Sequence, residues 1–280
     1  MKPSSQSVRT VSAPVIEPAT HDDSVVLRAE GVKIHYWLER DRAAFCAVDG
    51  FDLDIHQGEF VAIVGPSGCG KTTFLDAVGG LRKISGGRLE LKGKPITGPG
   101  TDRAIVFQQA SLFPWRKVRA NVAYGLKLAG KLSSAQIDET VGQHLDLVGL
   151  SAFGESYPNE LSGGMQQRAN LARALAADPE MLLLDEPFGA LDAQTRETMQ
   201  NELLRIWGVK RKTALFITHD IKEAIYLADR VVVMSTRPGR IIEVIPIDLP
   251  RPRRAETKRG AEFLAHEQHI EHLLEKVKQS

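Results

Sequence analysis

The sequence predicts an α/β fold in which helices cover both faces of a mainly parallel sheet. One observation is a set of short apolar runs of strand type, at residues 59–64, 105–108, 181–184 and 213–217. Continuous apolar strands are typical of a parallel sheet that is buried on both faces. The other observation is a set of segments with helical signals, at residues 73–78, 134–148, 163–177 and 193–209. The chain has 280 residues and 42% hydrophobic content, which is enough for the core of one such domain plus an appendage.

The segment between the first apolar run and its helix fits the motif G-x-x-x-x-G-K-[ST] in full. The segment consists of Gly65, Pro66, Ser67, Gly68, Cys69, Gly70, Lys71, Thr72 and Thr73. Backbone N–H groups of such a loop surround the β-phosphate of ATP, and Lys71 is expected to reach the β- and γ-phosphate oxygens. The Thr72 hydroxyl is expected to ligate Mg²⁺. A strand, this loop and a helix in that order predict a P-loop nucleoside triphosphatase core of the RecA-like type.

Two carboxylates, Asp185 and Glu186, come directly after the apolar run 181–184. In open parallel sheets, ligands bind beyond the carboxyl ends of the strands. We therefore expect Asp185 to hold Mg²⁺ through its water shell. Glu186 is then placed to orient and deprotonate the attacking water as the catalytic base.

Two further polar side chains stand at the ends of apolar runs. His219 follows the run 213–217, where the γ-phosphate is expected to lie, and Gln108 closes the run 105–108. The Gln108 amide is placed to ligate Mg²⁺ or to position the water. The pair Asp220 and Glu223 has the spacing of a capping box that opens the next helix.

A second anion site is predicted far along the chain, in Leu161–Arg168. A helix that opens at Ser162 presents unpaired backbone N–H groups and the positive end of its dipole. Gly163 and Gly164 allow a phosphate to come close to the backbone. Two phosphate sites in one chain suggest that two copies of the chain hold the nucleotide between them.

The chain divides into three parts. Residues 1–24 are rich in Ser, Pro and Thr and are expected to form a flexible tail. Residues 25–249 form the ATPase domain, in which a helical insert of about 110–178 carries the second anion site. Residues 250–280 comprise a Pro/Arg linker and an amphipathic helix that packs on its own domain. The basic residues of the linker are expected to be solvated, with contact to anionic lipid headgroups as the alternative.

Composition limits the partners and the compartment. There are 36 basic and 35 acidic residues, so no overall field favours nucleic acid. Two cysteines, Cys46 and Cys69, argue against a disulfide framework and suit a reducing cytoplasm. Neither a membrane-spanning run of about 20 apolar residues nor a signal peptide is expected.

From about Val25 to Val244 these motifs, in this order, resemble the ATP-binding subunit of ABC transporters. The resemblance implies an antiparallel β subdomain beside the RecA-like core. It makes Gln108 the Q-loop glutamine, Asp192 the D-loop aspartate and His219 the switch histidine. The signature 161–168 is then the part that acts on the partner's nucleotide, through Ser162, Gly163, Gly164 and Gln166. An aromatic side chain stacks on adenine in this family, and Tyr36 is the first candidate, with Trp37 and Phe45 as alternatives.

Within the family, Gly98-Pro99-Gly100 and Phe113-Pro114-Trp115-Arg116 are similar to the nitrate, sulfonate and taurine importer branch, and most similar to taurine importer ATPases. The resemblance implies a peripheral subunit on the cytoplasmic face of the membrane that energises import of taurine or another aliphatic sulfonate. The implied partners are a second ATPase subunit, transmembrane permease subunits and, indirectly, a periplasmic or extracellular solute-binding protein. Phe113 and Trp115 are expected to shape the groove for a short permease helix, with ordinary packing as the alternative. The alternatives in function are a nitrate or other small-solute importer, an exporter, and a non-transport ATPase of this fold.

Overall fold

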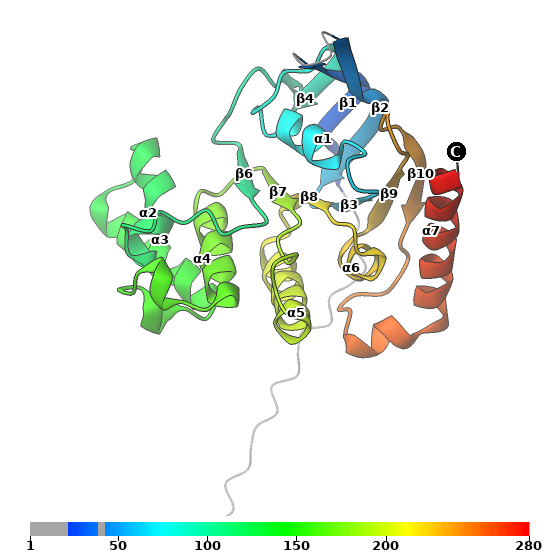
Figure 1. Ribbon diagram of the computed structural model, residues 1–280. Helices are drawn as coiled ribbons and strands as arrows, with labels where there is room; N and C mark the ends of the chain where they lie inside the picture. The colour runs from blue at the N-terminus through cyan, green and yellow to red at the C-terminus, as the bar shows by residue number, and fades with distance from the viewer. Residues whose placement is uncertain (1–21, 39–42, 280) are drawn as a thin grey trace, which may run out of the picture.

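The computed structural model describes residues 22–38 and 43–279, and Figure 1 shows their arrangement. The central sheet has six strands in the order β10-β9-β3-β8-β7-β6. All neighbouring pairs are parallel except β10 with β9. The strands are β3 (Phe60–Val64), β6 (Arg103–Val106), β7 (Met181–Asp185), β8 (Thr213–Ile217), β9 (Arg230–Met234) and β10 (Ile241–Pro246). The predicted α/β fold with a mainly parallel sheet is confirmed.

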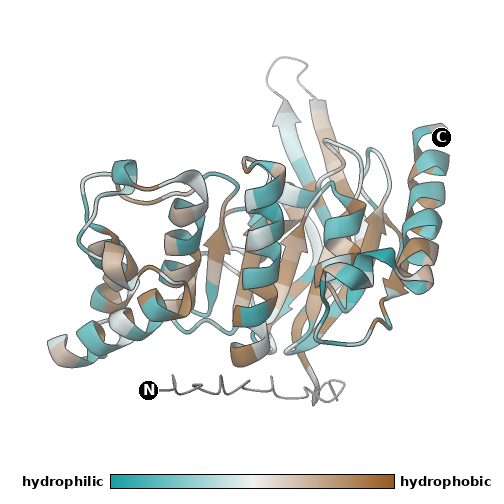
Figure 2. Cartoon of the chain, turned by 90° about the horizontal axis from the view of Figure 1, so that it is seen from below, coloured by the Kyte–Doolittle hydropathy of each residue, from teal (hydrophilic) through white to brown (hydrophobic). Residues whose placement is uncertain are grey.

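The apolar runs are continuous because both faces of this sheet are buried. On β3, Phe60, Ala62 and Val64 belong to the core on one face, whereas Val61 and Ile63 belong to the core on the other. Successive side chains of a strand point to opposite faces, so a strand between two cores has no position for a polar side chain. Figure 2 shows these strands as hydrophobic and the surrounding helices as mixed in hydropathy.

An antiparallel sheet of four strands in the order β2-β1-β4-β5 covers one face, as the family resemblance implied. Its strands are β1 (Asp22–Leu38), β2 (Ala43–Gln57), β4 (Gly86–Leu91) and β5 (Lys94–Pro95). Helix α1 (Lys71–Val78) lies between the two sheets, where Phe74 stacks on Phe51 with ring centroids 4.1 Å apart. Because β1 begins at Asp22, the last three residues of the predicted tail 1–24 belong to a strand. Residues 1–21 lie outside the described residues.

The helical insert lies beside the β6 edge of the central sheet (Figure 1). It contains α2 (Val118–Ala129), α3 (Ser134–Leu147) and α4 (Gly163–Ala176), with the short helices η1 (Ser151–Phe153) and η2 (Pro158–Glu160) before α4. Helix α3 begins with a capping box, in which the Ser133 hydroxyl accepts from Gln136 N–H and the Gln136 side chain accepts from Ser133 N–H.

Helices α5 (Ala193–Lys210) and α6 (Ile221–Leu227) cover the other face of the sheet. The predicted capping box at α6 is half right. Asp220 accepts from the backbone N–H of Glu223, but the Glu223 carboxylate turns into the core and accepts from Thr218 Oγ1 at 2.6 Å and Gln200 Nε2 at 2.9 Å. Burial raises the pKa of Glu223. These two donors, one hydroxyl and one amide, compensate the carboxylate for the water that it loses on burial. A single backbone N–H at the cap would compensate for less of this loss.

The C-terminal segment packs on the domain. After β10 the chain passes through η3 (Ala255–Arg259) into α7 (Ala261–Gln279), which contacts α6 and β9 through buried Phe263 and Ile270. The expectation that the linker's basic residues are solvated is wrong for Arg253, which is 6% exposed. Its guanidinium donates to the backbone carbonyls of Ile225 and Ala228, in and just after α6, and of Ile247, just after β10. The spacing of residues in the sequence does not reveal these acceptors. Among the described residues, no helix is both long and apolar enough to cross a membrane.

Candidate active site

The loop 65–70 joins the carboxyl end of β3 to the first turn of α1. Gly68 and Gly70 have φ values of 75° and 100°, a region that favours glycine. A Cβ atom on Gly70 would lie 2.8 Å from the carbonyl oxygen of Ala47. The close approach of β2 therefore excludes a side chain at Gly70 and fixes the loop against the antiparallel sheet.

Lys71 lies inside this loop and is 6% exposed. Its ammonium group donates to the carbonyl oxygens of Gly65 at 2.8 Å and Pro66 at 3.0 Å. The loop thus curves around one positive charge at the N-terminus of a helix, which is a favourable environment for phosphate. Cys69 belongs to this loop and its side chain is buried in the core, where burial raises the pKa of its thiol, so it is held as a neutral packing residue.

Thr72 and Asp185 bring two oxygen donors together at the end of β7. Thr72 Oγ1 donates to Asp185 Oδ1 at 3.1 Å. Burial raises the pKa of Asp185, and the neighbouring charge of Glu186 adds to this effect. A partly buried carboxylate beside a hydroxyl is a donor set suited to a hard cation such as Mg²⁺. The residues present therefore fit the metal.

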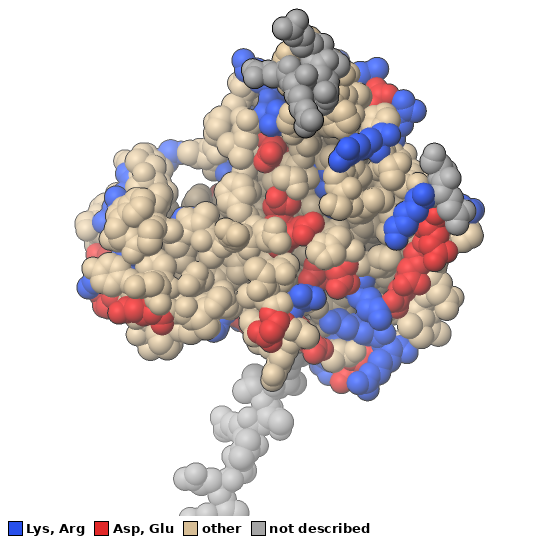
Figure 3. Space-filling view, in the orientation of Figure 1, with Lys and Arg blue, Asp and Glu red and all other residues tan. Residues whose placement is uncertain are grey.

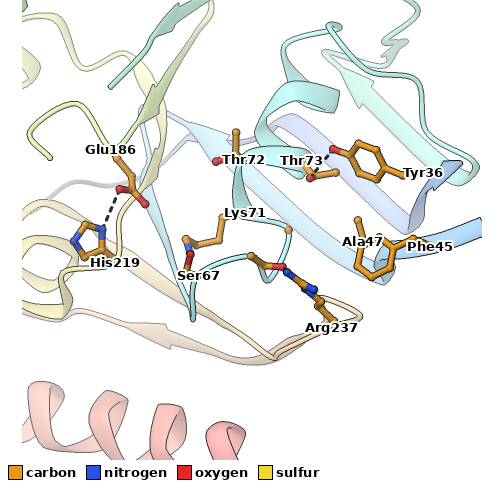
Figure 4. Close-up of a pocket in the computed structure, with 12 residues that line it drawn as sticks. Tyr36, Phe45, Ala47, Ser67, Lys71, Thr72, Thr73, Glu186, His219 and Arg237 are labelled. Atoms are coloured by element: carbon orange, nitrogen blue, oxygen red, sulfur yellow. Dashed lines mark hydrogen bonds and ion pairs between the residues drawn. The ribbon is translucent and has the colours of Figure 1, made fainter. Parts of the chain in front are cut away.

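Glu186 and His219 meet across the ends of β7 and β8 (Figure 4). Glu186 has a φ of 42°, which is uncommon for a residue with a side chain, and its N–H donates to the Ile217 carbonyl at 2.9 Å. This turn aims the carboxylate at His219, whose Nδ1 lies 3.0 Å from Glu186 Oε2. Backbone strain of this kind concentrates at functional sites.

Lys71, Thr72, Glu186 and His219 line one cavity of about 550 Å³. Tyr36 and Phe45 form its aromatic wall, and they share a face because they are directly opposite each other in the β1–β2 register. Trp37 belongs to the opposite face, is 67% exposed and does not line the cavity. Tyr36 donates to or accepts from Thr73 Oγ1 at 2.9 Å, and Arg82 lies 4.0 Å from its ring centroid.

Gln108 is not brought into this cavity. Its amide Nε2 lies 2.8 Å from the position that a Cβ atom on Gly189 would take, so it faces the loop after Glu186. Arg237, which sequence analysis did not select, does line the cavity, and its Nε donates to the Gly68 carbonyl at 3.3 Å. No local signal in the sequence marks Arg237 as a site residue.

The second anion site is well formed but lies elsewhere. Ser162 is the N-cap of α4, and its hydroxyl accepts from Met165 N–H at 3.4 Å. Ser162 and Gly164 line a separate cavity of about 330 Å³ with residues of α5, and it shares no lining residue with the Lys71 cavity. Gln166 donates to the carbonyls of Pro158 and Leu161 and so fixes the approach to α4.

Asp192 is the N-cap of α5, and its carboxylate accepts from Thr195 N–H at 3.0 Å. The Thr195 side chain and this N–H lower the pKa of Asp192. Asp192 therefore stays ionised at the start of a helix, where a negative charge is stabilising.

One connecting residue, Gln167, was missed. It is 5% exposed, and its amide Nε2 donates to the carbonyls of Phe107 at 3.2 Å, Gln108 at 3.0 Å and Pro187 at 2.6 Å. It thereby joins the signature helix to both the Gln108 segment and the loop that follows Glu186. The available signal was its place on the same helix face as buried Leu171 and Ala174, where a polar residue is unusual.

The fold and this cavity define the chain as a P-loop nucleoside triphosphatase. The family model described as ABC transporter matches residues 48–189. The chain belongs to the ABC transporter family, and it is an ATPase of that family.

The chain is similar to several curated proteins. It is 52% identical to a putative ATP-binding protein of Brucella abortus, with 81% of this chain and 87% of that protein covered. It is 49% identical to a nitrate import ATP-binding protein of Synechococcus elongatus (76% and 80% covered) and 48% identical to a taurine import ATP-binding protein of Shigella sonnei (73% and 80% covered). Among solved structures, a dimeric ATP-binding cassette in a post-hydrolysis state with ADP and Pi bound is similar, with a TM-score of 0.69, 30% identity, and 79% of this chain and 98% of that chain covered.

Proposed function

We propose that two copies of the chain associate head to tail and hold ATP between them. The observation that carries the proposal is the separation of the two anion sites. Ser162 and Gly164 line a cavity with α5, whereas Lys71 lines another cavity with no residue in common. In a two-fold dimer, the α4 N-terminus of one copy faces the Lys71 loop of the other at both sites. The dimeric state of the similar cassette supports this arrangement.

Each side chain has a role in hydrolysis. Lys71 and the loop N–H groups bind the β- and γ-phosphates, and Ser162 of the second copy closes on the γ-phosphate. Glu186 Oε2 is held by His219 at 3.0 Å, which leaves the other carboxylate oxygen to take a proton from the attacking water. Thr72 and Asp185 would hold Mg²⁺, and Gln108 would be a further ligand if its amide turned from Gly189 toward them. Bound Mg²⁺ would neutralise charge on the phosphates.

The transition from ATP to ADP and phosphate changes the association of the two copies. Bound ATP adds charge-assisted hydrogen bonds across the interface. Hydrolysis separates the γ-phosphate from the rest, and the two products repel each other between the chains. The interface then loosens, and the helical insert moves relative to the Lys71 loop.

A surface of Phe113 and Trp115 is the proposed contact with a membrane permease. Trp115 is 71% exposed, and Phe113 packs on Tyr124 with ring centroids 4.7 Å apart. The loop is fixed from below by Asn121, which is fully buried and donates to the carbonyls of Phe113 and Arg116. A rigid loop that presents a large exposed aromatic ring is suited to grip a short helix of a partner.

The proposed cargo is a small anion, taurine or another aliphatic sulfonate. The 48% identity to a taurine import ATP-binding protein supports it, and the 49% identity to a nitrate import protein supports nitrate as the second candidate. We place the chain on the cytoplasmic face of the membrane, with a separate permease and an external solute-binding protein. A non-transport ATPase is the remaining alternative, and membership of a transporter family counts against it.

Mixing two inactive variants tests the shared site. Lys71→Ala removes the lysine from its own loop, and Ser162→Arg blocks the α4 N-terminus that acts on the partner. A mixed dimer has one site with both defects and one site with neither, so phosphate release should reappear on mixing. Absence of rescue at every mixing ratio would contradict the proposal.

Growth tests identify the cargo. A strain that lacks this gene should fail to use taurine as its sole sulfur source, and the gene should restore growth. Normal use of taurine together with loss of growth on nitrate as sole nitrogen source would assign nitrate instead. Normal growth on both would exclude taurine and nitrate as the cargo.

A further inference from the structure

A second large cavity, of about 700 Å³, lies on the molecule away from the Lys71 loop. It is formed by the C-terminal turns of α5 and by residues 251–255, which lead from β10 toward α7. It shares no lining residue with the nucleotide cavity. Its floor is apolar and is made by Leu204, Trp207, Val209, Pro252 and Ala255. Val209 is 67% exposed, which is high for a valine in a folded domain.

The rim of this cavity is strongly basic. Its arginines are Arg205, Arg211, Arg251 and Arg254, with the buried Arg253 behind them, and no acidic residue lines it in the part of the chain that the structure describes. Figure 3 shows Lys and Arg side chains gathered over the segment between β10 and α7. Such a ring of guanidinium groups around an apolar floor is unusual unless it meets an anion, because like charges repel.

Only part of this positive charge is neutralised. Arg205 pairs with Glu202 and Arg251 pairs with Asp229. Among the described residues, neither Arg211 nor Arg254 has an acidic side chain within ion-pair distance. Their guanidinium groups therefore remain available to a ligand, and each can bind a carboxylate or phosphate with two parallel hydrogen bonds.

Arg253 adds a buried charge behind the rim. Its guanidinium donates to the carbonyls of Ile225, Tyr226 and Ala228 at the end of α6. Burial, together with the charge of Arg251, lowers the pKa of Arg253 to about 9. Carbonyl acceptors satisfy its N–H groups but do not cancel its charge, so the field in the cavity stays positive.

Trp207 joins the two parts of the cavity. Its indole N–H donates to the Lys212 carbonyl at 2.8 Å, and the Arg251 guanidinium lies 4.3 Å from the ring centroid. The ring is thus fixed in place at the base of the cavity, 5% exposed, with a cation over its face. A rigid aromatic side chain is a suitable platform for the apolar body of a ligand.

We propose that this cavity is a binding site for a small amphipathic anion, in which an apolar chain or ring carries one carboxylate, sulfonate or phosphate group. The apolar body packs on Leu204, Trp207 and Val209. The anionic group binds Arg211 and Arg254. A ligand needs both parts, since the floor lacks polar groups and Arg211 and Arg254 lack counter-charges among the described residues.

Decanoate tests the proposal, with decanol as the uncharged chain and acetate as the head group alone. The full chain with Trp37→Phe and Trp115→Phe leaves Trp207 as the remaining tryptophan, so its fluorescence reports on the cavity. Decanoate should change this fluorescence in a saturable manner and raise the melting temperature with concentration. Decanol and acetate should bind at least about tenfold more weakly, because each lacks one of the two interactions.

Variants locate the site. The double variant Arg211→Gln and Arg254→Gln should weaken decanoate binding by about tenfold or more. The loss of even one charge-assisted hydrogen bond weakens an affinity by about tenfold. Arg88→Gln, on exposed β4 and outside the cavity, is the matched control and should leave the affinity unchanged. Equal binding of decanol, equal affinity in the double variant, or an unchanged Trp207 signal would each overturn the proposal.

A vesicle arm separates a free ligand from a membrane lipid as the source of the anion. Flotation with phosphatidylglycerol vesicles, compared with phosphatidylcholine vesicles, should retain the chain if the source is an anionic lipid, and the double variant should abolish this retention. Saturable decanoate binding without flotation indicates a free ligand. Failure of both decanoate and anionic vesicles overturns the site.

Discussion

Gln167 offers the sharpest test of how the separate parts of the site are joined. We predict that Gln167→Met, which keeps the size of the side chain, destabilises the domain. The two N–H groups of the amide serve three carbonyl oxygens, those of Phe107, Gln108 and Pro187. The loss of the two N–H donors, at about 1 kcal/mol each, leaves all three carbonyls without this partner and gives a loss of about 2–4 kcal/mol.

Urea denaturation measures this loss, and Gln166→Met is the matched control. Gln166 is the next residue of the same helix, and its amide also donates to two carbonyls, those of Pro158 and Leu161. It is only partly buried, so water can replace the missing donor and the expected loss is below about 1 kcal/mol. If Gln167→Met lost no more stability than Gln166→Met, the amide would not be the connection that we infer.

Measurements of ATP affinity and turnover distinguish a role of Gln167 in positioning Glu186 from a role in stability alone. Nucleotide binding depends on the Lys71 loop, which Gln167 does not touch, so the affinity of Gln167→Met for ATP should stay within about twofold of the native chain. Turnover should fall, because the loop that carries Glu186 is displaced and small misplacements cost up to about 100-fold in rate. Unchanged turnover at a temperature where the variant is folded would exclude this role.

Three other predictions concern the nucleotide cavity. Glu186→Gln should retain ATP binding and lower turnover by two or more orders of magnitude, roughly the effect of losing a general base, as measured by phosphate release; unchanged turnover would remove Glu186 from the mechanism. Lys71→Ala should abolish nucleotide binding in a direct titration, and retained affinity would contradict the loop assignment. Asp185 has a pKa raised by burial, so its folded form holds a proton to higher pH than its unfolded form and its contribution to stability falls as pH rises through that interval. Asp185→Asn should therefore raise the melting temperature of the nucleotide-free chain at neutral pH. It should also abolish the increase in melting temperature that Mg²⁺ with ATP gives in the native chain. A lower melting temperature of the nucleotide-free variant at neutral pH would show that the Asp185 charge does not destabilise the fold.

Local patterns were sufficient to predict the central elements. The apolar runs predicted the strands at residues 181–184 and 213–217, and Gly65–Thr73 predicted the loop and the helix that follows. Hydrogen bonds between near neighbours fix such features, as the Ser133–Gln136 capping box shows. They depend on residues within a few positions of one another, so spacing alone reveals them.

Contacts between distant segments decided the rest. The β1–β2 register put Tyr36 and Phe45 on one face and Trp37 on the other, although all three are aromatic residues close together in the sequence. Gln108 faces Gly189 instead of Asp185, because its orientation is set by a loop some 80 positions further along the chain. Spacing gives no information about such partners.

What the sequence by itself determined, then, is the set of side chains with phosphate and carboxylate chemistry and the strands or helices that carry them. Only the tertiary structure decided that Glu223 and Arg253 turn inward, that Gln167 joins three segments, and that Ser162 lies apart from Lys71. The physical reason is that burial and hydrogen-bond partners are properties of the packed chain. A polar side chain takes the orientation that satisfies it, and its partners come from wherever the fold brings donors and acceptors together.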